Sequence, residues 1–383
     1  MTVLSLIGKA ACLKNYHQDS NLLIMQRFDK YIIGKFLKTF FFGISIFVVI
    51  VIVFDISEKI DDFLENNVPI NAIVFKYYFN FIPYFINLFS PFFIFLSVIA
   101  FSSKMALNME FISIFNSGIS LKRLYYPFFI TSLFLASFSF FLGNFIIPSS
   151  NIERIEFENN YLKGKKNKRI KSKNIQILPG QYIYMDSYNS VRDIAYKFSI
   201  ENIENGKLVS KLNSSYAQYD TTLSKWKIFN YQIRKFNDSN EILSFGKQID
   251  TLINFSPDDL KYRKNIVETM NLFELNKFIE REKIKGNEQI LYYKLEKHKR
   301  LSYPFSTVIL TIIAFAISLK RRKGGMGINI ALGIFIAFSF ILFMQISTTF
   351  SIKSNLSPFL SVWIPNILYA MLAFVLIRKK QLV

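Results

Sequence analysis

Side chains that commonly carry catalytic or metal chemistry are few in this sequence, and they lie far apart. The chain has one Cys, Cys12, and two His, His17 and His298. A disulfide needs two Cys, and a protein zinc site needs three or four Cys, His or carboxylate ligands brought together. We therefore expect no disulfide, no metal centre and no cofactor.

Motifs for phosphate binding and hydrolysis are also missing. Gly-Lys pairs begin at positions 34, 164, 206 and 246, but none lies in the G-x-x-x-x-G-K-[ST] pattern that cradles nucleotide phosphates. The sequence has no G-x-S-x-G turn and no H-E-x-x-H helix. An enzyme is the function class we expect least. If the protein moves a substrate, the energy must come from a partner.

The distribution of charge indicates what kind of protein this is. The 383 residues include 43 Phe and carry a formal net charge of +20, yet long stretches have no charge at all. A transmembrane helix needs about 20 apolar residues, and Lys35 and Lys38 can extend the first, shorter stretch by reaching toward the interface. We predict six transmembrane helices, and no nucleic-acid partner. The uncharged stretches are Thr39–Phe54, Tyr77–Ser103, Leu124–Ile152, Leu301–Leu319, Gly324–Ile352 and Ser354–Ile377.

Basic residues between these stretches predict the orientation. The segments on one side, residues 1–38, 104–123, 320–323 and 378–383, carry 16 Lys and Arg, whereas the two short loops on the other side carry 3. The positive-inside rule then places both termini in the cytoplasm. No ionisable residue lies near the middle of a predicted span, which argues against an ion-driven transporter.

The long segment between the third and fourth spans has a different residue pattern from the rest of the chain. Alternating apolar and polar runs are separated by the turn-forming pairs Pro179-Gly180, Asn205-Gly206 and Asn237-Asp238. This pattern predicts an extracytoplasmic all-β domain, a β-sandwich or a jelly-roll-like module, followed by helical segments at 272–281 and 289–300 that lead into the fourth span. The alternating runs are Gln181–Asp186, Ala195–Ile203, Leu208–Tyr219 and Trp226–Phe236.

These patterns divide the chain into four parts. Residues 1–24 are an N-terminal extension or precede a second candidate start at Met25. Residues 25–147 hold the first three spans and a cytoplasmic amphipathic helix at about 104–120. Residues 148–300 form the β domain with its helical return, and residues 301–383 hold the last three spans.

Four segments resemble the lipopolysaccharide-export permease family, LptF and LptG. They are Arg27–Phe36 (RFDKYIIGKF), Met109–Pro127 (MEFISIFNSGISLKRLYYP), Tyr292–Phe305 (YYKLEKHKRLSYPF) and Ser357–Tyr369 (SPFLSVWIPNILY). Their order and spacing match the family from about residue 25 onward, and the opening segment is slightly more similar to LptG.

The resemblance implies an ABC-type exporter and a set of partners. Two sister permease subunits work with a cytoplasmic ATPase dimer, extract lipopolysaccharide from the inner membrane and pass it through the β domain to periplasmic bridge proteins. Two alternatives stay open. The chain could belong to another ABC assembly, for lipoprotein release or mechanotransmission, or it could be a membrane-anchored periplasmic scaffold.

The resemblance also implies two sets of site residues. A coupling helix would dock in the ATPase through an apolar ridge, with Glu110 seeking an Arg of the partner; a helix lying on the inner leaflet is the alternative. Its residues would be Met109, Glu110, Phe111, Ile112, Phe115, Gly118 and Ile119, with Gly118 ending the helix. The lipid would enter beside the first and fifth spans, near Lys35, Lys38, Lys59, Phe335 and Phe338.

Two runs of like charge fit solvated surfaces better than lipid sites. Five acidic residues lie between Asp55 and Glu65, just after the first uncharged stretch. They would repel lipid phosphates unless divalent cations bridged the two. Seven basic residues lie between Lys163 and Lys173, where a solvated loop is the simpler interpretation.

Overall fold

The structure is a computed structural model, and it describes residues 27–162, 169–189, 192–221, 223–237, 240–253, 255, 257, 264–285, 287, 289–319, 325–353 and 356–381. The predicted extension at 1–24, residues 163–168 of the basic run and the basic loop at 320–323 lie outside this range. The chain forms two compact units. One comprises the residues up to Ser150 together with those from His298 onward, and the other comprises Asn151–Lys297.

Six helices in the described part of the chain are long and apolar enough to cross a membrane. Prolines inside four of these spans are tolerated because neighbouring helices can cover the carbonyls they leave free. The spans are α2 (Arg27–Glu65); η1 and α3 (Ala72–Tyr78 and Phe79–Leu107); α5, η2, α6 and η3 (Leu121–Phe141, Leu142–Ile146, Ile147–Phe157 and Glu158–Leu162); α9 (Ile290–Ser318); α10 (Gly325–Lys353); and α11 (Pro358–Gln381).

Close contacts between small and aromatic side chains hold the helical unit together. A Cβ atom on Gly333 of α10 would clash with the Ile99 side chain of α3, so glycine lets these two helices approach closely. The rings of Phe128 on α5 and Phe315 on α9 are 4.6 Å apart. Buried Asn366 on α11 donates a hydrogen bond of 3.4 Å to the backbone oxygen of Ser302 on α9.

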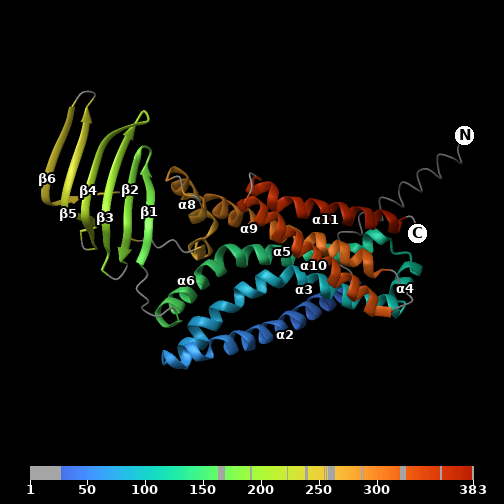
Figure 1. Ribbon diagram of the computed structural model, residues 1–383. Helices are drawn as coiled ribbons and strands as arrows, with labels where there is room; N and C mark the ends of the chain where they lie inside the picture. Colours follow the sequence, from blue (N-terminus) through green and yellow to red (C-terminus); the bar gives the residue numbers. More distant parts are fainter. Residues whose placement is uncertain are drawn as a thin grey trace, which may run out of the picture. The chain divides into compact units, whose positions relative to one another are not determined.

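The start of α2, the short helix α4 (Glu110–Asn116) and the end of α11 lie at one end of the helical unit (Figure 1). An even number of spans requires that the first begin and the last end on the same side. This end of the helical unit therefore carries the segments that the distribution of basic residues predicts to be cytoplasmic.

The second unit contains one antiparallel sheet in which each strand pairs with the next in sequence (Figure 1). Asn205 and Gly206 both have positive φ, as a tight hairpin turn requires. The strands are β1 (Arg169–Leu178), β2 (Gln181–Asn189), β3 (Ile194–Glu204), β4 (Lys207–Asp220), β5 (Lys225–Asn237) and β6 (Asn240–Thr251). The four alternating runs correspond to β2–β5; β1 and β6 were not predicted.

The core of the sheet is built around Trp226, which is fully buried. Its indole stacks on Phe198, and its Nε1 donates a hydrogen bond of 2.7 Å to the backbone oxygen of Phe255. After the sheet, α8 (Leu272–Ile284) begins at a capping box made by Asn271 and Glu274, and α9 begins at Ile290. The predicted fold class is confirmed: six apolar helices with an all-β domain between the third and the fourth.

Candidate functional site

The predicted coupling helix is shorter than the sequence suggested. We predicted one helix over 104–120, but Lys104–Leu107 form the last turn of α3, and α4 runs only from Glu110 to Asn116. Met109 separates the two helices because its φ of 61° lies in the left-handed region. Gly118, with φ 83°, follows the end of α4, and its N–H bonds to the Phe115 oxygen at 3.0 Å. Ile119 therefore lies outside the helix.

The apolar side chains around α4 divide into a buried and an exposed set. Phe111 is 2% exposed and anchors α4 to its own unit. Ile112 is 50% exposed, and Met109 and Phe115 are also exposed. A helix of seven residues has little stability of its own, so the anchoring by Phe111 matters. We call Met109, Ile112 and Phe115 the exposed α4 residues.

Glu110, which we expected to seek an Arg of the partner, has contacts within its own chain. Its carboxylate accepts hydrogen bonds from the Tyr31 hydroxyl of α2 at 3.2 Å and from the Asn108 amide at 3.3 Å. The Lys35 ammonium lies 3.6 Å from it and also contacts the Tyr31 hydroxyl. Lys35, which we had placed beside the entering lipid, thus joins the first span to the start of α4.

Sequence reasoning missed a second contact at this end of the helical unit. Arg123, in the first turn of α5, donates two hydrogen bonds of 2.7 and 2.5 Å to the carboxylate of Asp29 on α2. Asp29 is 1% exposed, and such paired geometry is what a buried carboxylate requires. The sequence did contain a sign of this pair. Asp29 precedes the first predicted span and Arg123 precedes the third, and the predicted topology places both residues at the cytoplasmic side of the membrane.

The other end of α2 holds a cluster that includes Lys59. The ammonium of Lys59 lies 2.6 Å from Asp55, and it contacts the hydroxyl of Tyr77. Tyr78 donates a hydrogen bond of 3.1 Å to the same carboxylate. We call these four residues the Asp55 cluster. Lys59 is thus bound within its own chain. The later acids of the run, Asp61, Asp62 and Glu65, are exposed.

The remaining predicted lipid contacts lie on outward-facing surfaces. Lys38 is exposed on α2, and Phe335 is 71% exposed on α10. Phe338 is also exposed, and its ring lies 6.0 Å from that of Phe92 on α3. Of the six spans, α2 and α10 are the two least covered by the rest of the chain. These spans are the ones beside which the lipid was predicted to enter.

Comparison with known families decides the identity. The sequence model described as "Lipopolysaccharide export system permease LptF/LptG" matches residues 30–379, nearly the whole chain. The chain belongs to the LptF/LptG family. A comparison with curated proteins found no match. The family match treats LptF and LptG together and so does not distinguish them.

Membership of the LptF/LptG family fixes the general role. Its members are permease subunits of lipopolysaccharide export, not enzymes, and this chain has the six apolar helices of a multi-pass inner-membrane protein. The two ends of α2 and the exposed α4 residues are therefore features of a permease.

Proposed function

We propose that this LptF/LptG-family chain is one of two permease subunits that act with a cytoplasmic ATPase dimer. Together they extract lipopolysaccharide from the inner membrane and pass it through the β domain to periplasmic bridge proteins. The observation that carries the assignment of the ATPase site is the exposed α4 residues, which lie on a helix anchored to the bundle by Phe111. Exposed apolar side chains on an anchored helix favour a groove on a partner.

Two contacts can transmit movement of α4 to the first span. Glu110 links α4 to Tyr31 and Lys35, and Arg123 links the following helix to Asp29. All three contacted residues lie within the first turns of α2. A shift of α4 on ATP binding would therefore move the start of α2 directly, through these side-chain contacts.

The exposed surfaces of α2 and α10 suggest where the lipid is held. Both helices carry large outward apolar side chains, including Phe42, Val49 and Phe54 on α2 and Phe335 on α10. Between two subunits such surfaces would form an apolar cavity, which acyl chains could enter from the bilayer without leaving an apolar environment. Closing this cavity would push the lipid toward the β domain.

The ATPase assignment is tested by co-purification with a matched pair of variants. Ile112→Asp places a charge among the exposed α4 residues, and Ile70→Asp makes the same change at an exposed position between α2 and η1. We expect the full-length chain and Ile70→Asp to recover a sister permease and an ATPase from gently solubilised native membranes. Ile112→Asp should keep the permease and lose the ATPase.

Other results would contradict the proposal. Recovery of the ATPase in equal amounts with both variants would remove α4 from the interface. Recovery of periplasmic proteins alone, unchanged by either variant, would favour the scaffold alternative.

A further inference from the structure

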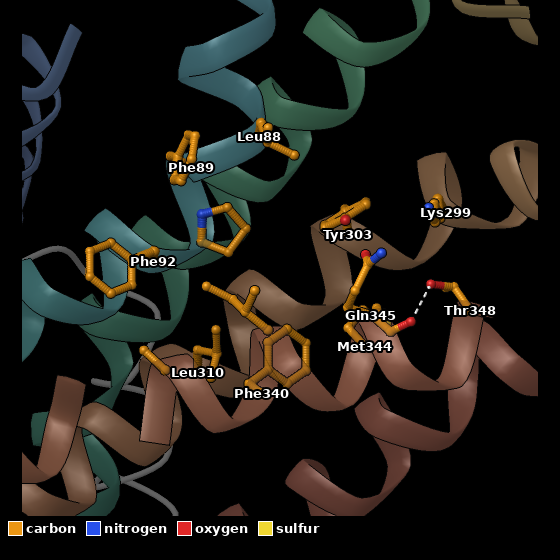
Figure 2. Close-up of a pocket in the computed structure, with 13 residues that line it drawn as sticks. Leu88, Phe89, Phe92, Lys299, Tyr303, Leu310, Phe340, Met344, Gln345 and Thr348 are labelled. Atoms are coloured by element: carbon orange, nitrogen blue, oxygen red, sulfur yellow. Dashed lines mark hydrogen bonds between the residues drawn. The ribbon is translucent and has the colours of Figure 1, made fainter. Parts of the chain in front are cut away.

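A cavity of about 200 Å³ lies between α3, α9 and α10, within the helical unit (Figure 2). One end of its lining is apolar and includes Phe89 and Phe92 of α3, Leu310 of α9 and Phe340 of α10. This volume is smaller than an ordinary ligand pocket of 300–1,000 Å³. It could not hold a lipid with several acyl chains, but it can hold part of one chain.

The other end of the cavity is polar. Lys299 and Tyr303 of α9 and Gln345 and Thr348 of α10 lie together on one side of the view, away from Phe89 and Phe92 (Figure 2). The Thr348 hydroxyl bonds to the backbone oxygen of Gln345 at 3.0 Å. Among the described residues, neither the Lys299 ammonium nor the Gln345 side-chain amide has a hydrogen-bond partner. One cation and one amide are thus available to an anionic group.

The cavity has the depth and direction of a lipid tail. Lys299 precedes the uncharged stretch of α9, and Thr348 lies near Lys353, the charge that ends the uncharged stretch of α10. Both polar residues therefore mark the level of the membrane interface. Leu310 lies 11 residues beyond Lys299, about 16 Å along the helix at 1.5 Å per residue. That is half of a hydrocarbon core about 30 Å thick.

We propose that this cavity binds part of one acyl chain of a phosphate-headed lipid, with Lys299 and Gln345 contacting the phosphate. The lipid is either a glycerophospholipid of the bilayer or a lipid A molecule with one of its chains inserted. The inference needs only that the bundle lies in a membrane, so it does not rest on the proposed export cycle. An inserted chain would fill the gap beside Phe340 and Met344 and fix α10 against α3 and α9.

The test uses the full-length chain, purified with whatever co-purifies and returned to vesicles of phosphatidylcholine. A phosphatidylglycerol with a photoreactive group in its tail is crosslinked, and the labelled peptides are identified by mass spectrometry. Detergent washes before irradiation remove lipid held loosely at the outward Phe335 surface, and we expect the remaining label on the α3, α9 and α10 segments that line the cavity.

Three variants test the two ends of the cavity. Lys299→Gln should lower the retained label about fivefold, the effect of one Lys beside an anionic headgroup. Lys353→Gln removes an exposed Lys at the same end of α10 and should change nothing. Leu88→Trp narrows the cavity from a half-exposed position that tolerates bulk, and it should abolish cavity labelling while the thermal unfolding temperature is unchanged.

Competition identifies the source of the lipid. Loss of label on adding unlabelled phosphatidylglycerol, but not purified lipid A, assigns the site to a bilayer phospholipid. Loss on adding lipid A at lower concentration assigns it to that lipid. Equal labelling of the wild-type chain, Lys299→Gln and Leu88→Trp would overturn the proposal.

Discussion

The two ends of α2 are both fixed by a carboxylate, but the cations that bind these carboxylates come from different places. Asp29 is bound by Arg123, which lies 94 residues away on α5. Asp55 is bound by Lys59, one turn along the same helix, and only the hydroxyls of Tyr77 and Tyr78 reach it from η1. The first end therefore joins two spans by an ion pair, whereas the second is held across the helices by hydrogen bonds from uncharged tyrosine hydroxyls.

This difference suggests that the ends of α2 move unequally. The cation and the carboxylate of the Asp29–Arg123 pair cannot separate without leaving a charge buried, which costs several kcal/mol. In the Asp55 cluster, α2 can move away from η1 and take both charges with it. We infer that the start of α2 follows α4 and α5, while its far end is free to open toward a lipid.

The largest expected effect is at Asp29. Arg123→Gln leaves this carboxylate, 1% exposed, without its cation, so the free energy of unfolding should fall by about 3–5 kcal/mol. Lys122→Gln, which removes an exposed cation from the neighbouring position, should have almost no effect. Unfolding in detergent measures both. The double variant Asp29→Asn, Arg123→Gln should recover much of the loss, and if it does not, the pair is not the cause.

A smaller effect is expected at the far end. Lys59→Gln removes the cation from Asp55, but this carboxylate is 12% exposed on its side chain and keeps two tyrosine hydroxyls. We expect a loss of about 1–2 kcal/mol, measured in the same way, with the exposed Lys76→Gln as control. A loss as large as that of Arg123→Gln would remove the distinction between the two ends.

The sequence predicted elements whose signal is local. Uncharged stretches predicted the six spans, and alternation predicted β2–β5, since both patterns are set by the immediate surroundings of each residue. β6 was missed because most of its residues are exposed, so the strand has no buried face to produce an alternation. β1 was missed because it begins within the basic run at 163–173, where charge suggested a loop.

The candidate site was predicted less well because it depends on contacts between distant residues. Glu110 and Lys35 were both selected from sequence, but for different roles. Their ion pair depends on how α2 and α4 are rotated toward each other. The length of α4 depends on the left-handed backbone of Met109, which is rarely adopted by a residue of this type. Neither property has a local sequence signal.

A variant of Glu110 can separate the stability of the fold from the coupling of α4 to α2. Its ion pair with Lys35 is partly exposed and 3.6 Å long, so Glu110→Gln should cost less than about 1 kcal/mol in unfolding. The exposed α4 residues are unchanged, so the ATPase should still co-purify. We expect lipid-stimulated ATP hydrolysis to fall, because the link from α4 to α2 is weakened. Hydrolysis equal to that of the wild-type chain would place the coupling in the Asp29–Arg123 pair alone.

The smallest effect on stability is expected at Lys38. It lies one turn beyond Lys35 on α2, but it is exposed, so Lys38→Gln should change the free energy of unfolding by less than about 0.5 kcal/mol. If this Lys contacts a lipid phosphate, crosslinking of lipopolysaccharide to α2 should still fall, by up to about fivefold. Lys35→Gln should have the opposite effect. Crosslinking should change little, whereas the free energy of unfolding should fall measurably because the ion pair with Glu110 is lost. Crosslinking by both variants equal to that of the wild-type chain would mean that the start of α2 has no role in lipid access.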